Sequence, residues 1–197
     1  MVLIKINYEN VSPFIKITYD ETPIYVKTTF DNVYAKVVYG TCGVTTTKYY
    51  GAFSDYTNQT ASVINTGYAM TFDTTDLSNG VTIVDGSKIT FANDGIYNIQ
   101  FSAQLKSTVT NSENDVNIWL KKNGIDVVGS AGFVAVPRKT GNTNGHSLPS
   151  WNFLLDINSG DYYQFYWSTT NVGVSIATYP ASFHPSTASI VLTATQI

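Results

Sequence analysis

The residues that could carry chemistry in this chain are few and far apart. Two histidines, His146 and His184, have no second histidine or cysteine at the spacing of a zinc site. Cys42 is the one cysteine, so it cannot form an internal disulfide, and no Cys-His signature accompanies it. The sequence also contains no Gly-x-Ser-x-Gly elbow and no glycine-rich phosphate loop opening a helix. These patterns predict a protein that is not an enzyme and needs no cofactor.

Two short acidic clusters are the remaining candidates for chemistry. Asp73 and Asp76 form one, and Glu113 and Asp115 form the other. Paired carboxylates can hold calcium or act as acid and base in glycan cleavage. Neither cluster has the ligand spacing of a calcium loop, so we interpret both as solvated loops and predict no metal site.

The composition predicts the elements that must position any site. Charged residues make up 13% of the chain, against roughly 25% in typical globular domains. Aromatic residues make up 14%, and such residues suit a pleated, half-buried surface, so we expect an all-β fold. A net charge of −3 gives no electrostatic reason to bind nucleic acid. With no membrane-spanning apolar run and no signal-peptide pattern, we expect a protein made in the cytoplasm without membrane insertion.

Residues 1–40 contain a repeat of four short alternating segments, which end at Tyr8, Tyr19, Phe30 and Tyr39. Proline, aspartate and asparagine lie between the segments, so the pattern predicts a four-stranded β-meander. A sheet of about 40 residues rarely folds alone, and its apolar face must pack on the rest of the chain, on sister copies or on a larger assembly. The residues predicted to make this attachment are Ile4, Ile6, Tyr8, Ile15, Ile17 and Tyr19.

A segment rich in glycine and threonine, residues 41–48, is the predicted linker to a second region. From residue 49 to residue 197, short alternating strands recur between turn signals, and no helical period appears. About 150 residues of this kind favour a β-sandwich or a jelly roll.

One stretch of this second region carries a resemblance to a known family. Residues 91–101, Phe-Ala-Asn-Asp-Gly-Ile-Tyr-Asn-Ile-Gln-Phe, contain an apolar strand end, a turn, and then Gly-x-Tyr-x-apolar-x-aromatic. This pattern resembles the hallmark of the tumour-necrosis-factor-like jelly roll, in the branch with complement-type globular heads. Further segments occur in the order that the resemblance implies: 68–72, 119–124, 154–162 and 188–192. The match covers residues 49–197, and it departs at 129–149, which is longer and more polar than the family's connection.

The resemblance implies a compact homotrimer around a threefold axis. Residues 162–167 support it independently, because aromatic side chains alternate onto both faces of the predicted strand. A sandwich strand buries one face in the core, so a second apolar face predicts a protein interface. The alternative is a strand buried on both faces within one chain. The predicted interface residues are Tyr97, Ile99, Phe101, Tyr163, Phe165 and Trp167.

A β-repeat followed by a jelly-roll head is similar to virion proteins of tailed bacteriophages. The resemblance implies a non-catalytic head fibre, tail fibre or capsid-decorating protein on the outer surface of the virion. Residues 1–40 would attach it to a capsid or tail protein, and the head would project toward a host-surface receptor, with a glycan as the ligand class considered. The candidate receptor residues, in two small polar loops, are Asn142, Asn144, His146 and Asn171.

Two alternatives stay open from the sequence. A free-standing bacterial carbohydrate-binding or adhesive module would act without a virion, and it predicts aromatic side chains exposed on the outer surface. A glycan-cleaving enzyme predicts carboxylates that converge in a cleft.

Overall fold

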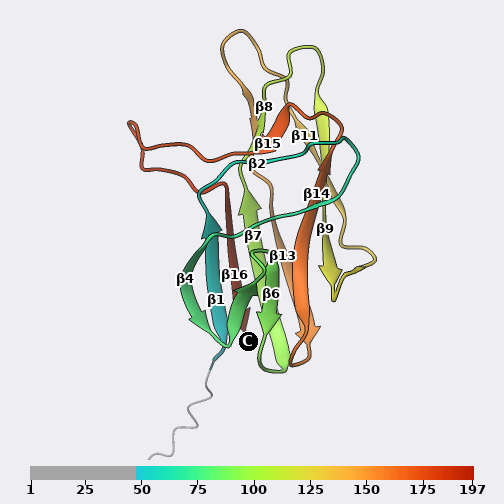
Figure 1. Ribbon diagram of the computed structural model, residues 1–197, viewed down its shortest axis with the longest axis vertical. Helices are drawn as coiled ribbons and strands as arrows, with labels where there is room; N and C mark the ends of the chain where they lie inside the picture. The colour runs from blue at the N-terminus through green and yellow to red at the C-terminus, as the bar shows by residue number, and fades with distance from the viewer. Residues whose placement is uncertain (1–47) are drawn as a thin grey trace, which may run out of the picture. The chain divides into compact units, whose positions relative to one another are not determined.

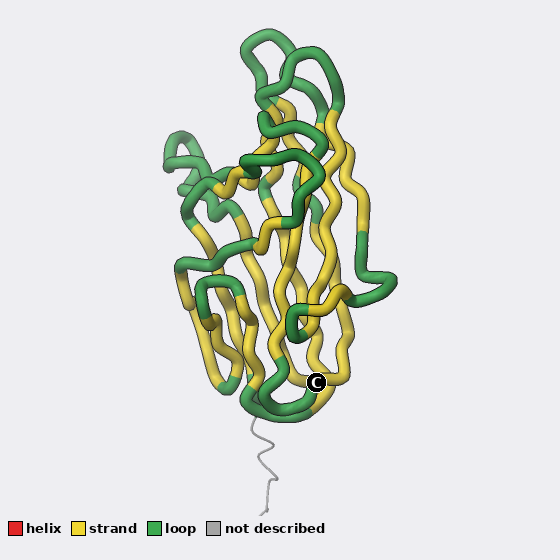
Figure 2. Tube along the Cα trace, turned by 45° about the vertical axis from the view of Figure 1, so that its right-hand side comes forward, coloured by secondary structure: helices red, strands yellow, loops and turns green. Residues whose placement is uncertain are grey.

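The computed structural model describes residues 48–197, and every regular element in that range is a β-strand. Among these residues, no helix is long and apolar enough to span a membrane. All strand pairs are antiparallel, and the longer strands run lengthwise with loops at both ends (Figures 1 and 2). The prediction of an all-β fold is therefore confirmed for residues 48–197. The predicted meander of residues 1–40 lies outside the described residues.

Three antiparallel sheets build this region. Sheet 1 has the strand order β13 (Ser150–Ile157), β7 (Gly95–Ala103), β16 (Ile190–Gln196), β1 (Tyr50–Asp55) and β4 (Thr74–Asn79). Sheet 2 has the order β10 (Ile125–Asp126), β9 (Asn114–Lys122), β14 (Tyr162–Thr169), β6 (Lys88–Phe91) and β5 (Val81–Val84), with β11 (Gly132–Val136) paired to β9 and β3 (Tyr68–Ala69) paired to β14. Sheet 3 has the order β12 (Gly145–Ser147), β8 (Leu105–Ser107), β15 (Val174–Ile176) and β2 (Gln59–Thr60), in the upper part of Figure 1.

The main core lies between sheets 1 and 2 and is rich in aromatic side chains. In β7 every second residue is buried, and Phe101 of this strand meets Phe165 of β14 with ring centroids 4.3 Å apart. Phe91 of β6 contacts both Tyr97, at 4.8 Å between centroids, and Tyr163, at 6.2 Å. Burying an apolar side chain of this size stabilises the fold by about 1.5–3 kcal/mol, so this layer is a large part of the driving force for folding.

The six residues predicted for a trimer interface are all in this core. Their exposed fractions lie between 0% and 3%, because the side chains of sheets 1 and 2 enclose one another. They are therefore core residues of the single chain and offer no surface that a partner can reach. They are Tyr97, Ile99, Phe101, Tyr163, Phe165 and Trp167. Any interface must use outward-facing residues instead.

A tight turn sets the register of the hairpin between β9 and β10. Asn123 and Gly124 both have positive φ angles, 50° and 83°, as a two-residue type I′ turn requires. The turn pairs Lys122 with Ile125 and Lys121 with Asp126. This register places a lysine and an aspartate side by side on the outer surface.

Candidate interaction surfaces

The outward side chains of β13, β7 and β16 form one continuous surface, which we call the sheet 1 face. Its Leu154 and Val191 are 62% and 45% exposed. Asp156 is the one charged side chain among the outward residues of these three strands. The centre of the sheet 1 face consists of three rows of neighbouring side chains, each row taking one residue from β13, one from β7 and one from β16. The rows are Leu154, Asn98 and Thr195; Asn152, Gln100 and Thr193; and Ser150, Ser102 and Val191.

A shallow hollow of about 490 Å³ lies on the sheet 1 face, over the rows that contain Gln100 and Ser102. Beside it, the side-chain oxygen Oδ1 of Asn98 is buried and has no hydrogen-bond partner among the described residues. A buried carbonyl oxygen without a donor costs about 1–3 kcal/mol. Oδ1 of Asn117, on the outward side of β9, is likewise buried without a partner among the described residues.

The outer surface of sheet 2 carries a different set of side chains, which we call the sheet 2 face. Trp119 of β9 lies opposite Tyr166 of β14, with ring centroids 5.8 Å apart. The Lys121 Nζ lies 4.6 Å from the centroid of the Tyr166 ring and 3.3 Å from Oδ1 of Asp126. The indole N–H of Trp119 donates to the same oxygen at 2.8 Å. Two aromatic rings and a neutralised ion pair thus occupy one patch of the surface.

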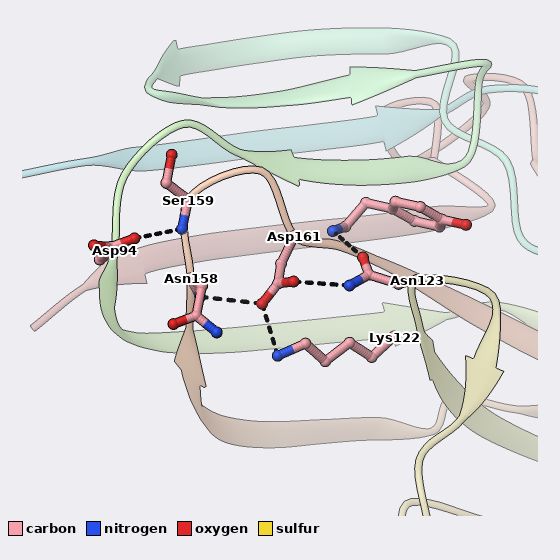
Figure 3. Close-up of polar contacts among 7 residues, drawn as sticks. Asp94, Lys122, Asn123, Asn158, Ser159 and Asp161 are labelled. Atoms are coloured by element: carbon pink, nitrogen blue, oxygen red, sulfur yellow. Dashed lines mark hydrogen bonds and ion pairs between the residues drawn. The ribbon is translucent and has the colours of Figure 1, made fainter.

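A polar network joins the turns at the end of the sandwich opposite to sheet 3 (Figure 3). Asp161 accepts hydrogen bonds from the Lys122 Nζ at 2.6 Å, from Asn123 Nδ2 at 2.8 Å and from the backbone N–H of Asn158 at 3.1 Å. The Lys122 contact, together with the Asn123 and Asn158 hydrogen bonds, lowers the pKa of Asp161 to about 2. The same contact raises the pKa of Lys122. Because these donors engage the carboxylate, the network ties the turns together.

The two predicted receptor loops meet at the upper end of the domain. Gly145 of one loop and Val174 of the other both pair with Ser107 of β8, one on each side. The structure therefore brings together two segments whose paired residues lie 29 positions apart in the sequence. Asn142 is exposed and Asn144 is half-buried on the first loop.

The other two predicted receptor residues have partners of their own. His146 is exposed on β12, and its Nδ1 lies 3.0 Å from the Tyr179 hydroxyl. Asn171 Oδ1 accepts a hydrogen bond from the backbone N–H of Gly173 at 2.9 Å, so this side chain closes its own turn. His146 is thus the more accessible of the two for a ligand.

The acidic clusters and the attachment residues complete the predicted sites. Asp73 accepts from the backbone N–H of Tyr56, and Asp76 accepts from the Ser54 hydroxyl at 3.0 Å. Within residues 48–197, no three histidine, cysteine or acidic side chains come together as metal ligands. The predicted attachment residues lie outside the described part of the chain: Ile4, Ile6, Tyr8, Ile15, Ile17 and Tyr19.

Comparison with known proteins identifies no family for the chain. No protein-family model matches the sequence, and a search of curated proteins finds no match. The structural result is an all-β domain of several antiparallel sheets, with two outer faces of contrasting chemistry.

Proposed function

We propose that the chain is a non-catalytic virion structural protein: a head fibre, a tail fibre or a capsid-decorating protein. Its residues 49–197 would form a tumour-necrosis-factor-like jelly roll that assembles as a homotrimer. The strand order supports this fold, because β7 lies between β13 and β16, and β14 lies between β9 and β6. Neighbours that are distant in sequence, in two sheets that share a core, are typical of the Greek-key connections of a jelly roll.

The chemistry of the sheet 1 face is the main support for a trimer. Its central side chains are neutral, and Leu154 and Val191 are exposed on it. The centres of protein interfaces are likewise depleted in charged residues. The six aromatic and aliphatic core residues predicted earlier do not take part, so the threefold contact is assigned to outward residues such as Gln100, Val191 and Thr193.

We further propose that the trimer is attached to a virion. Residues 1–40 attach it to a capsid or tail protein, and the head projects from the outer surface of the virion toward a host-surface glycan. The protein is made in the host cytoplasm and takes no part in nucleic-acid binding or membrane insertion. A non-catalytic role is supported by Asp73, Asp76 and Asp161, whose carboxylates are each taken up by local hydrogen bonds.

The solution mass of the full chain, measured by light-scattering chromatography, tests this proposal. A homotrimer gives three times the 21.6 kDa of one chain. A monomer at all concentrations would contradict it.

The monomer result would instead support a free-standing carbohydrate-binding or adhesive module. The pair of half-buried rings, Trp119 and Tyr166, on the outer side of sheet 2 is the observation that favours this second candidate, because aromatic side chains at a surface can bind a ligand without assembly.

A further inference from the structure

The sheet 2 face holds its aromatic pair in a fixed position. Trp119 and Tyr166 are directly opposite each other on neighbouring antiparallel strands, and Asp126 holds the indole N–H. The backbone of Gly67 lies against both rings: a Cβ there would be 2.9 Å from Cζ2 of Trp119 and 3.3 Å from Cδ1 of Tyr166. Only a glycine allows this close approach. The rings are therefore ordered before any ligand arrives, which lowers the entropic cost of binding.

Polar groups beside the rings remain able to bind. Asp126 is 66% exposed at its side chain, and only its Oδ1 is engaged, by Trp119 and Lys121. None of the described residues donates to Oδ2 of Asp126. The Lys121 ammonium group has three N–H donors and lies 3.3 Å from Oδ1 of Asp126 as an ion pair. The patch therefore offers an acceptor and a donor a few ångströms apart, next to two half-buried aromatic rings.

These properties define the class of ligand. A saccharide has an apolar C–H face that packs on an aromatic ring and neighbouring hydroxyls that both donate and accept hydrogen bonds. The charges of Lys121 and Asp126 cancel, so the patch gives no net attraction to an anion such as a nucleic acid or a phosphate. We propose that Trp119, Tyr166, Lys121 and Asp126 form a binding site for a neutral saccharide.

The site extends the proposed function, because it gives the projecting head a receptor contact separate from the two upper loops. It rests on that function only for its biological role. The sheet 2 face is on the opposite side of the sandwich from the sheet 1 face, so a trimer built through sheet 1 leaves it accessible. Three copies in one trimer would bind a host surface in a multivalent way, and weak single sites would then suffice.

The same sheet contains a matched control. Asp85, Lys88 and Tyr162 repeat the ion pair over a tyrosine: the Lys88 Nζ lies 2.7 Å from Oδ2 of Asp85 and 5.3 Å from the Tyr162 ring centroid. This second set has no tryptophan beside it. Asp85 is 68% exposed at its side chain, close to the 66% of Asp126. Substitution of either aspartate removes one exposed carboxylate, and only Asp126 belongs to the proposed site.

The test titrates the full chain with maltotriose, cellotriose, chitotriose and lactose and measures the heat of binding by isothermal titration calorimetry. We expect saturable binding of at least one sugar, with Kd on the order of 1 mM for a single site. Asp126→Ala and Trp119→Phe each weaken that binding about tenfold, while Asp85→Asn, which suits the positive φ of 51° at this position, binds as the unaltered protein does. Unchanged melting temperatures check that the variants are folded. The proposal is overturned if none of the four sugars binds, or if Asp85→Asn weakens binding as much as Asp126→Ala.

The chromatographic mass of the same samples separates this inference from the proposed function. A trimer that binds none of the sugars overturns the saccharide site alone. A monomer that binds a sugar through Trp119 and Asp126 overturns the trimer and supports the site.

Discussion

Replacing Asp161 by asparagine tests whether the polar network of Figure 3 stabilises the fold. The substitution keeps the shape of the side chain and removes the charge that faces Lys122, 2.6 Å away. Asp161 has its pKa lowered from 3.8 to about 2, chiefly by the Lys122 contact. A difference of this size corresponds to about 2 kcal/mol in favour of the carboxylate. Solvent screens the pair, since the Lys122 side chain is 33% exposed, so we expect Asp161→Asn to lower the free energy of unfolding by about 1–2 kcal/mol at pH 7.

The pH dependence gives the same prediction a second readout. Because the folded pKa of Asp161 is lowered, its stabilising contribution is present above the unfolded pKa and is lost as the pH falls through the folded value. The difference in unfolding free energy between the unaltered protein and Asp161→Asn is therefore constant near neutral pH. It shrinks between about pH 4 and pH 2.

Urea denaturation of both proteins at several pH values is the assay. Asp85→Asn is the control, because Asp85 makes an ion pair with Lys88 but is 68% exposed, and we expect it to cost clearly less than Asp161→Asn. The reasoning is refuted if Asp161→Asn costs no more than Asp85→Asn, or if its effect persists unchanged to pH 2.

Two further substitutions test the packing of the domain. Phe165→Ala leaves a cavity in a fully buried layer of side chains. We expect the free energy of unfolding, measured with denaturant, to fall by about 3–5 kcal/mol. A fall below about 1 kcal/mol would contradict the core described for β7 and β14. Gly145→Ala would place a Cβ against the carbonyl oxygen of Pro137. We expect the free energy of unfolding to fall by about 3 kcal/mol or more and the amide hydrogens of β12 to exchange faster. The control Gly86→Ala has open space and a φ of 70°, and we expect it to cost about 1 kcal/mol, so equal losses at both glycines would refute the steric argument.

The strands were predictable where apolar and polar residues alternate. Residues 95–103 alternate cleanly and form β7, with Tyr97, Ile99 and Phe101 turned inward together. The Asn123-Gly124 dipeptide was also informative, because a two-residue turn fixes the pairing of Lys121 with Asp126. The sheet 2 face could therefore have been located from the sequence through the register of this hairpin.

The outward faces and the short strands were harder to predict. β14 carries aromatic side chains on both faces, and the sequence pattern cannot tell which face enters the core. The interface was consequently assigned to the Tyr163 side, which is buried. The polar stretch 129–149 contains β11 and β12, and both strands depend on pairing with distant residues of β9 and β8 rather than on their own composition.

The most direct test of the assembly compares the chromatographic masses of Val191→Lys and Val84→Lys. Val191 lies on the sheet 1 face at 45% exposure, and Val84 lies on the outer surface of sheet 2 at 43% exposure, so the two changes are matched in chemistry and burial. Lysine in the centre of an interface leaves a buried charge without a partner, so we expect Val191→Lys to dissociate the trimer and Val84→Lys to retain it. A trimer that survives Val191→Lys, or that is lost equally in both variants, would contradict assembly through the sheet 1 face.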